Sequence, residues 1–149
     1  MNIDARFEGQ DDFRRGMEKT AKELPGRIYK AMVQACSLVE TRAKTHHLAG
    51  ATLKPRTHQF QRSVKSIVRR SGGTISGRVG SPVVYAAIHE YGGIIKPKNA
   101  KYLVFQIDGK WIRTKKVTMP KREWLSKSLR DVQGQIENIF GRHIEIAIG

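Results

Sequence analysis

The side chains that could act as nucleophiles, bases or metal ligands are few in this sequence and poorly spaced for joint action. His89-Glu90 would need a second histidine at position 93 to form a zinc-protease motif, and that position is glycine. The neighbours His46 and His47 would point about 100° apart on a helix and could not easily chelate one metal ion together. Cys36 falls on an apolar helical stripe, where a small core residue is expected rather than a nucleophile. We therefore expect no metal site.

Phosphate-binding loops and paired carboxylates are also missing from the pattern. The glycines of residues 72–80 flank an expected strand and lack a following helix that begins with Lys-Ser or Lys-Thr. Residues 41–89 contain no acid, so they cannot supply the carboxylates of a two-metal nuclease. The sequence therefore predicts a protein that is not an enzyme and uses no cofactor.

The chemistry that the chain does offer is positive charge. Its 28 lysines and arginines against 13 aspartates and glutamates give a formal net charge of +15. The excess lies in the middle, since residues 41–89 hold nine basic residues and no acid, and residues 91–130 hold eleven basic residues and two acids. Such segregation favours a negatively charged partner, with phosphate the usual one, although a solvated basic surface without a specific partner is the alternative. The candidates for facing DNA or another polyanion are Lys54, Arg56, Arg62, Lys65, Arg69 and Arg70.

Aromatic residues are scarce in the same stretch. Residues 41–89 contain only Phe60 and Tyr85, and both fall in segments with an apolar pattern. Proteins that bind single strands interleave aromatic and basic residues so that bases can stack. If this protein meets nucleic acid, we therefore expect it to contact phosphates without reading the base sequence.

Length and hydropathy limit the class of protein. A chain of 149 residues that is 39% hydrophobic suffices for one domain with one core. The longest apolar run, residues 83–88, is far shorter than the roughly 18 residues that span a bilayer. The single cysteine excludes an internal disulfide, and the acidic start of the chain does not resemble a signal peptide. We expect a soluble, intracellular, single-domain protein with no membrane partner.

The first third of the chain is expected to be mostly helical. Alternation over residues 3–7 predicts a short strand, and apolar residues at helical spacing predict a helix over 13–24 and another over 28–43 that runs to about His46. Pro25 either begins the second helix or kinks one long helix. Residues 47–59 have little apolar pattern beyond Leu48 and Leu53, and they predict a long, flexible assembly loop that orders against a neighbouring subunit or ring. A loop folded back on its own sheet is the alternative.

The remaining residues alternate between strand and helix signals. Residues 60–68 favour a helix that turns into a strand, a turn follows at 71–73, and 74–80 predicts a return strand. A short helix is expected over 82–91, a hairpin over 102–114 around Asp108-Gly109, and a last helix that Pro120 opens. The residues at 144–148 alternate and could fray from that helix into a strand. The order predicts an α+β fold: a small antiparallel sheet with long amphipathic helices packed on one face.

Several segments carry a resemblance to one family. Residues 84–93, VYAAIHEYGG, resemble a segment of the neck and tail-completion proteins of long-tailed bacteriophages. Residues 94–103 resemble that family's basic link into the next strand, 119–125 (MPKREWL) resemble its entry to the last helix, and 60–64 echo an upstream segment. Glu123 and Trp124 stand where that family usually has proline and phenylalanine, and the Thr-Gly pair usual before the upstream segment is missing.

The resemblance implies a structural role in the virion, in the neck, where such proteins join the tail to the DNA-filled head. It implies a homo-oligomeric ring of six or twelve copies around the DNA path, with neighbouring neck and tail-terminator proteins as partners and assembly in the host cytoplasm. A sequence-independent DNA-binding protein of phage or bacterial origin is the alternative. Glu90 is expected to pair either with a basic residue of its own chain, such as Arg122, or with a neighbouring subunit. The expected scaffold residues are Tyr85, His89, Glu90, Tyr91, Gly92, Gly93, Pro120 and Arg122.

Overall fold

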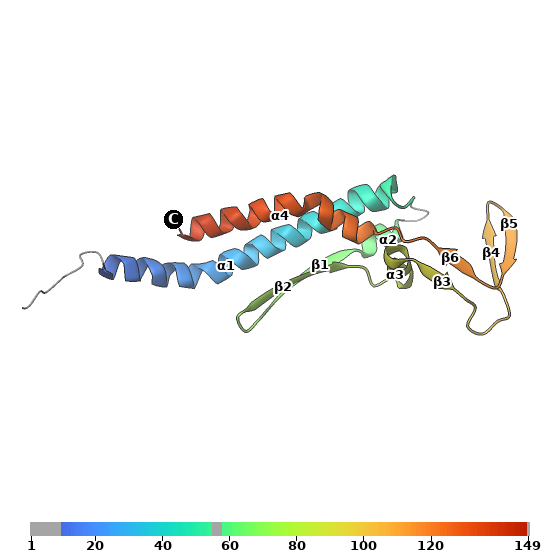
Figure 1. Cartoon of the computed structure of the whole chain (residues 1–149), viewed down its shortest axis with the longest axis horizontal. Coiled ribbons are helices and arrows are strands. Elements are labelled where there is room, and N and C mark those ends of the chain that lie inside the picture. The colour runs from blue at the N-terminus through green and yellow to red at the C-terminus, as the bar shows by residue number, and fades with distance from the viewer. Residues whose placement is uncertain (1–9, 55–57, 149) are drawn as a thin grey trace, which may run out of the picture.

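One long helix organises the molecule. The computed structural model describes residues 10–54 and 58–148, and in it helix α1 spans Gln10–Arg42 without a break (Figure 1). Asp11 and Asp12 lie in its first turn, where the helix dipole favours anions. Pro25 lies inside α1, so of the two possibilities it does not begin a second helix. Apolar residues at helical spacing continue on both sides of Pro25, as one continuous helix requires. The strand predicted over 3–7 lies outside the described residues.

The segment expected as a flexible loop begins as helix. Residues Ala43–Ala51 form the wide helix η1, which ends at Gly50 with a φ of 134°. Leu48 and Leu53 are buried in the chain's own core, so the expected loop is wrong for this described part. Gln59 likewise belongs to helix α2 (Gln59–Ser63). Two apolar side chains proved sufficient because the hydrophobic core closes around them.

The strands form three separate ladders instead of one small sheet. Strand β1 (Lys65–Ser71) pairs with β2 (Thr74–Gly80), β3 (Gly93–Ile95) with β6 (Val117–Met119), and β4 (Leu103–Ile107) with β5 (Lys110–Thr114), all antiparallel. At the β4–β5 turn, Asp108 has a φ of 49° and Gly109 a φ of 80°, as a tight two-residue hairpin requires. The α+β class and the strand pairs over 65–80 and 102–114 are confirmed.

Helix α1 packs against two different elements. Helix α4 (Trp124–Ile148) lies along it, and the β1–β2 hairpin lies on another side of it (Figure 1). At Gly77 the strand approaches α1 so closely that an added Cβ would overlap Cys36 Sγ and would lie 2.8 Å from Met32 Sδ. Cys36 is buried there as a small core residue, as expected. Helix α4 begins at Trp124 rather than at Pro120, and it continues to Ile148 without fraying into a strand.

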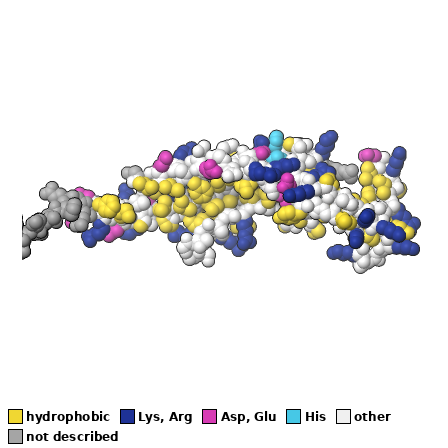
Figure 2. Space-filling model, in the orientation of Figure 1, with side chains coloured by type: hydrophobic (Ala, Val, Ile, Leu, Met, Phe, Trp, Pro, Cys, Tyr) yellow, Lys and Arg dark blue, Asp and Glu magenta, His cyan; other side chains and the backbone are white. Residues whose placement is uncertain are grey.

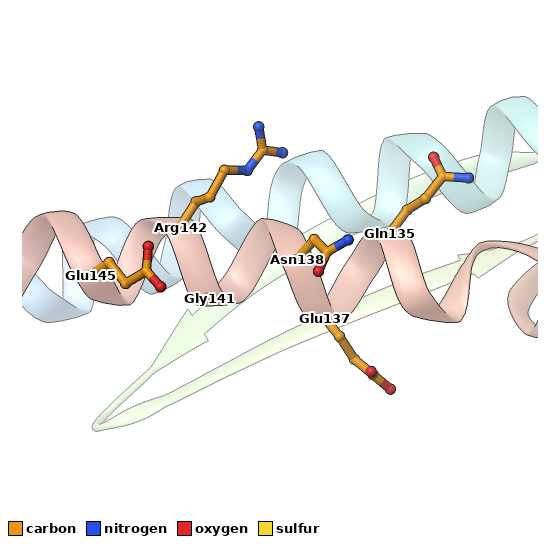
Figure 3. Close-up of a pocket in the computed structure, with 6 residues that line it drawn as sticks. All are labelled: Gln135, Glu137, Asn138, Gly141, Arg142 and Glu145. Atoms are coloured by element: carbon orange, nitrogen blue, oxygen red, sulfur yellow. The ribbon is translucent and has the colours of Figure 1, made fainter.

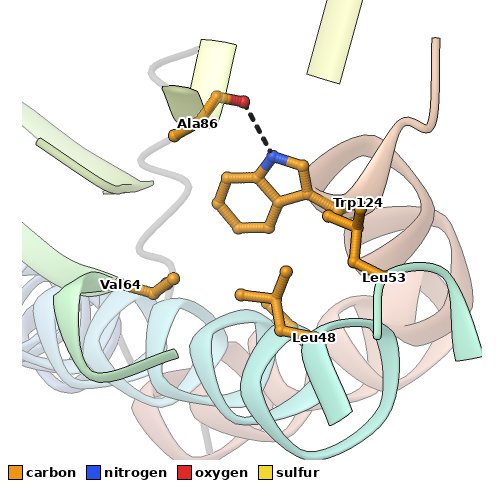
Figure 4. Close-up of a cluster of buried hydrophobic side chains, with 6 residues drawn as sticks. Leu48, Leu53, Val64, Ala86 and Trp124 are labelled. Carbon is orange, nitrogen blue, oxygen red and sulfur yellow. Dashed lines mark hydrogen bonds between the residues drawn. The ribbon is translucent and has the colours of Figure 1, made fainter. Parts of the chain in front are cut away.

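The compact part of the core lies where η1, α2, helix α3 (Val84–Tyr91) and the start of α4 meet. Leu48, Leu53, Val64, Ala86 and Trp124 are buried together there (Figure 4). The indole Nε1 of Trp124 donates a 3.1 Å hydrogen bond to the carbonyl oxygen of Ala86, which satisfies the polar atom of this buried ring. Within residues 10–54 and 58–148, no helix is long and apolar enough to cross a membrane.

Candidate functional site

Glu90 links two of the sequence segments that the family resemblance singled out. Its side chain is buried at the end of α3, and its carboxylate accepts hydrogen bonds from the backbone N–H groups of Leu125 (2.8 Å) and Ser126 (3.1 Å) and from the Ser126 hydroxyl. A carboxylate at this position satisfies orphan donors of the first turn of α4 and lies favourably in the helix dipole. Glu90 is therefore the cap of α4, and the expected pairing with Arg122 is wrong.

At the end of α3, the backbone of Gly92 lies so close to the backbone of residues 119–121 that only glycine fits. Gly92 has a φ of 71°, and an added Cβ would lie 2.8 Å from the backbone nitrogen of Lys121 and 3.0 Å from the carbonyl oxygen of Met119. The backbone N–H of Arg122 donates to the carbonyl oxygen of His89 at 3.0 Å. Glu123, with a φ of 52°, then turns the chain into α4. The two segments thus form one rigid junction, with the α3 end and the α4 start held backbone to backbone.

Rings of α2 and α3 pack around the same junction. Phe60 meets Tyr85 edge to face at 5.4 Å between centroids, stacks near His89 at 6.1 Å and meets Trp124 at 5.0 Å. Burial, together with the nearby charge of Arg122, lowers the pKa of His89 and so favours its neutral imidazole. The predicted scaffold residues Tyr85, His89, Glu90, Gly92, Gly93 and Arg122 meet here, whereas the side chain of Tyr91 is 74% exposed and Pro120 is exposed.

A second polar cluster joins η1 to α4. Asp131 Oδ2 accepts hydrogen bonds from Arg42 (2.8 Å) and lies 2.9 Å from His47 Nε2, whose other ring nitrogen lies 2.8 Å from the Thr52 hydroxyl. The Arg42 guanidinium, then His47, lowers the pKa of Asp131. His46, His47 and Asp131 place one ligand atom each within 4.8 Å of one another, closer than expected for adjacent histidines because η1 is wider than an α-helix.

Protein groups already bind two members of this cluster, His47 and Asp131. Both ring nitrogens of His47 have partners, and the guanidinium of Arg42 occupies the Asp131 oxygen that a cation would need. A cation there would meet the charge of Arg42 at close range. The arrangement suits a clamp between η1 and α4 better than it suits a metal site.

The basic candidates do not form one surface. Lys65 and Arg69 project from the same face of the β1–β2 hairpin, where Arg78 joins them opposite Ile67, and this face points away from α1. Arg70 belongs to the other face of the ladder. Lys54 and Arg62 are exposed but come from the end of η1 and from α2, and Arg56 lies outside the described residues. We call Lys65, Arg69 and Arg78 the basic hairpin face.

Two hollows on the surface of the described residues lie along α4. One, with a volume of about 540 Å³, is lined by Gln135, Glu137, Asn138, Gly141, Arg142 and Glu145, all on the outer side of α4 (Figure 3). One of about 380 Å³ lies between α1 and α4 beside Asp131. Neither hollow brings a nucleophile together with a base, as acyl or phosphoryl transfer would require.

Sequence reasoning missed three contributors to these junctions. Trp124 was noted only as a departure from the family pattern, yet it is the largest residue of the buried cluster. Asp131 and His47 are 84 residues apart, and nothing in the sequence pairs them. The contact between Glu90 and the first turn of α4 also joins distant residues, since Glu90 and Leu125 are 35 residues apart. One signal was present: a single acid in a basic stretch indicates that the acid has a specific partner.

The comparisons with known proteins agree with the scaffold character of these junctions. Residues 17–145, which include α3, the Glu90 cap and most of α4, match the phage virion morphogenesis family. No curated protein and no solved structure matches the chain. The matched range covers far more than half of the sequence, so this chain belongs to the phage virion morphogenesis family and serves in building a bacteriophage particle.

Proposed function

We propose that this protein is a non-enzymatic tail-completion component of a tailed bacteriophage, which joins the head to the tail in the neck. The observation that carries the proposal is the α3–α4 junction: the two segments that most resemble neck proteins, 84–93 and 119–125, are held together by the Glu90 cap and the close approach at Gly92. Family membership supports the virion role. These two segments hold the fold together. Such a structural role fits an assembly protein, whose function depends on its shape.

The proposal includes a homo-oligomeric ring of six or twelve copies around the DNA path, assembled in the host cytoplasm and retained in the virion. Neighbouring neck and tail-terminator proteins would contact it from above and below. The basic hairpin face would meet DNA phosphates, because its three cations lie on one face of one strand pair and can contact a phosphate backbone together.

Deletion of the gene tests the joining role. We expect cells infected with the deletion phage to release DNA-filled heads and separate tails, and a plasmid copy of the gene to restore joined particles. Electron microscopy of the lysate gives the result directly. Joined, infectious particles without the protein would overturn the proposal.

The basic hairpin face also favours a second function, sequence-independent DNA binding outside the particle. Under that function the deletion phage would still assemble normally. Binding to two unrelated duplexes should be equal and should weaken with salt by a slope of about 0.9 per phosphate contact. Replacing Lys65, Arg69 and Arg78 with glutamine should lower that slope by about 2.7.

A matched triple on α1, Lys19, Lys22 and Lys30 to glutamine, controls for the loss of net charge alone, because these side chains are exposed and do not belong to the basic hairpin face. The control should leave the slope near the wild-type value. Equal effects of both triples would show that the basic hairpin face is no DNA contact, and a strong preference for one duplex would contradict phosphate-only binding.

A further inference from the structure

The part of the chain between α3 and α4 has no core of its own. We call residues 93–119, which contain β3 to β6, the hairpin extension. None of the residues from 91 to 123 is buried. Even the large apolar side chains of Trp111 (73%), Val104 and Ile94 are exposed to solvent. Its β4–β5 hairpin stands apart at one end of the molecule and makes only slight contact with other described elements (Figure 1). An isolated two-stranded hairpin is marginally stable in water, so the extension needs a surface to pack against.

The helices expose a matching apolar surface. On α4, Leu129, Ile136, Phe140, Ile144 and Ile148 recur at spacings of seven and four residues, beside the stripe that packs on α1. Leu129 is 51% exposed and Ile148 is 69% exposed, and hydrophobic side chains form a broad band over the long helices (Figure 2). We call this exposed stripe of α4 the helical face. Exposed apolar side chains that adjoin one another on a folded protein mark interaction sites.

The exposed area gives the size of the missing contact. The chain exposes 11,568 Å², whereas a compact monomer of 16.9 kDa exposes about 7,700 Å². The 13 residues outside the described ranges could account for at most about 2,100 Å², even if fully extended. More than about 1,700 Å² remains, which is close to two half-interfaces of about 800 Å² each. A subunit in a closed ring contributes two such half-interfaces, one to each neighbour.

Charge selects the partner and the direction of docking. The hairpin extension carries seven basic residues and one acid, Asp108, whereas α4 from Asp131 onward carries three carboxylates and one basic residue. Glu137 borders the helical face, three residues before Phe140. The basic extension and the far ends of the helices lie at opposite ends of the long axis (Figures 1 and 2). A two-fold dimer that paired extension with extension would bring like charges together.

We propose that the hairpin extension of one copy docks on the helical face of a second copy, head to tail, with Trp111 as the apolar anchor. This inference rests on the proposed function, because a head-to-tail contact is the kind that closes into a ring. Trp111 has the features of a binding hot spot, since it is a large aromatic ring on β5 that is 73% exposed. Glu137 and Glu145 on the neighbour then face the lysines of the extension.

Sedimentation velocity and native mass spectrometry of the full chain test the contact. We expect the wild type to form oligomers larger than dimers as concentration rises. Trp111→Ser and Leu129→Ser should each raise the dissociation constant at least ~30-fold. Val84→Ser is the matched control, because Val84 is 95% exposed on α3 and belongs to neither surface, and it should assemble as the wild type does. Circular dichroism checks that each variant folds.

Mixing the two variants tests the direction. Trp111→Ser keeps a sound helical face and Leu129→Ser keeps a sound extension, so together they should form heterodimers and nothing larger. The double charge reversals Lys115→Glu/Lys116→Glu and Glu137→Lys/Glu145→Lys should each weaken association of the unmixed variant, and their mixture should recover at least about tenfold in affinity. Larger oligomers from the Trp111→Ser and Leu129→Ser mixture, or wild-type assembly by Trp111→Ser alone, would overturn the proposal.

The inference and the proposed function fail in different experiments. A wild type that stays monomeric at every concentration overturns the head-to-tail contact, and the surfaces are then covered by another virion protein. The joining role would still stand if the deletion phage left heads and tails apart. Normal particles from the deletion phage would overturn the joining role, whatever the purified chain does.

Discussion

Removing the carboxylate of Glu90 should uncouple α4 from α3. In Glu90→Ala, the N–H groups of Leu125 and Ser126 lose their acceptor at a partly buried junction. Each buried donor left without a partner costs about 1–3 kcal/mol, and the lost interaction with the helix dipole adds about 0.3–1 kcal/mol. The sum for two donors and the dipole is about 2–7 kcal/mol, and because both donors are only partly buried we expect the lower end, about 2–3 kcal/mol, against the roughly 5–15 kcal/mol of a folded domain.

Urea unfolding followed by tryptophan fluorescence measures this loss. Trp124 is buried next to the junction and Trp111 is exposed, so a Trp111→Phe background isolates the signal of the core. Glu90→Gln, which keeps one acceptor oxygen, should lose less than half as much. Glu18→Ala is the control, because Glu18 is an exposed carboxylate in α1. A loss below about 1 kcal/mol for Glu90→Ala would refute the role of Glu90 as the cap of α4.

Two further substitutions test other junctions. Gly92→Ala should destabilise the fold by about 1–3 kcal/mol, since φ at Gly92 is 71° and the methyl would press on the chain before α4, whereas Gly73→Ala has neither problem and should change the urea midpoint little. Asp131→Asn removes the clamp with Arg42 and His47. Because the folded-state pKa of Asp131 is lowered, its stabilisation is full above the unfolded pKa near 4 and is lost as pH falls below it, so the wild type and the variant should converge in stability at low pH. A difference in midpoint that persisted at pH 2 would contradict the clamp.

Local patterns predicted most of the elements and few of the contacts. Asp108-Gly109 predicted its hairpin because the two positive φ angles are a property of those two residues alone. The end of α3 followed in the same way from Gly92. The position of Pro25 was ambiguous in the sequence, since a proline can start a helix or lie inside one. In the structure α1 continues through it.

The contacts that the pattern could not give are all long-range. Leu48 and Leu53 seemed too few to order a loop because their partners, Val64 and Trp124, come from distant segments. Glu90 was expected to meet a cation, the commonest partner of a buried acid, whereas its partners are backbone donors that exist only once α4 forms. The expectation of a single sheet failed since alternation specifies a strand and says nothing of how many ladders the strands share.

The space at Gly77 has a consequence for how this chain can vary among its relatives. Between strand β2 and helix α1 there is space for one methyl-sized group. Cys36 Sγ fills that space, so residue 77 can have no side chain there. A larger residue at position 77 requires a smaller one at position 36, or a bend of the flexible Met32 side chain. Substitutions at positions 36 and 77 are therefore expected to occur as compensating pairs, which would record the distance between helix and strand in the sequences themselves.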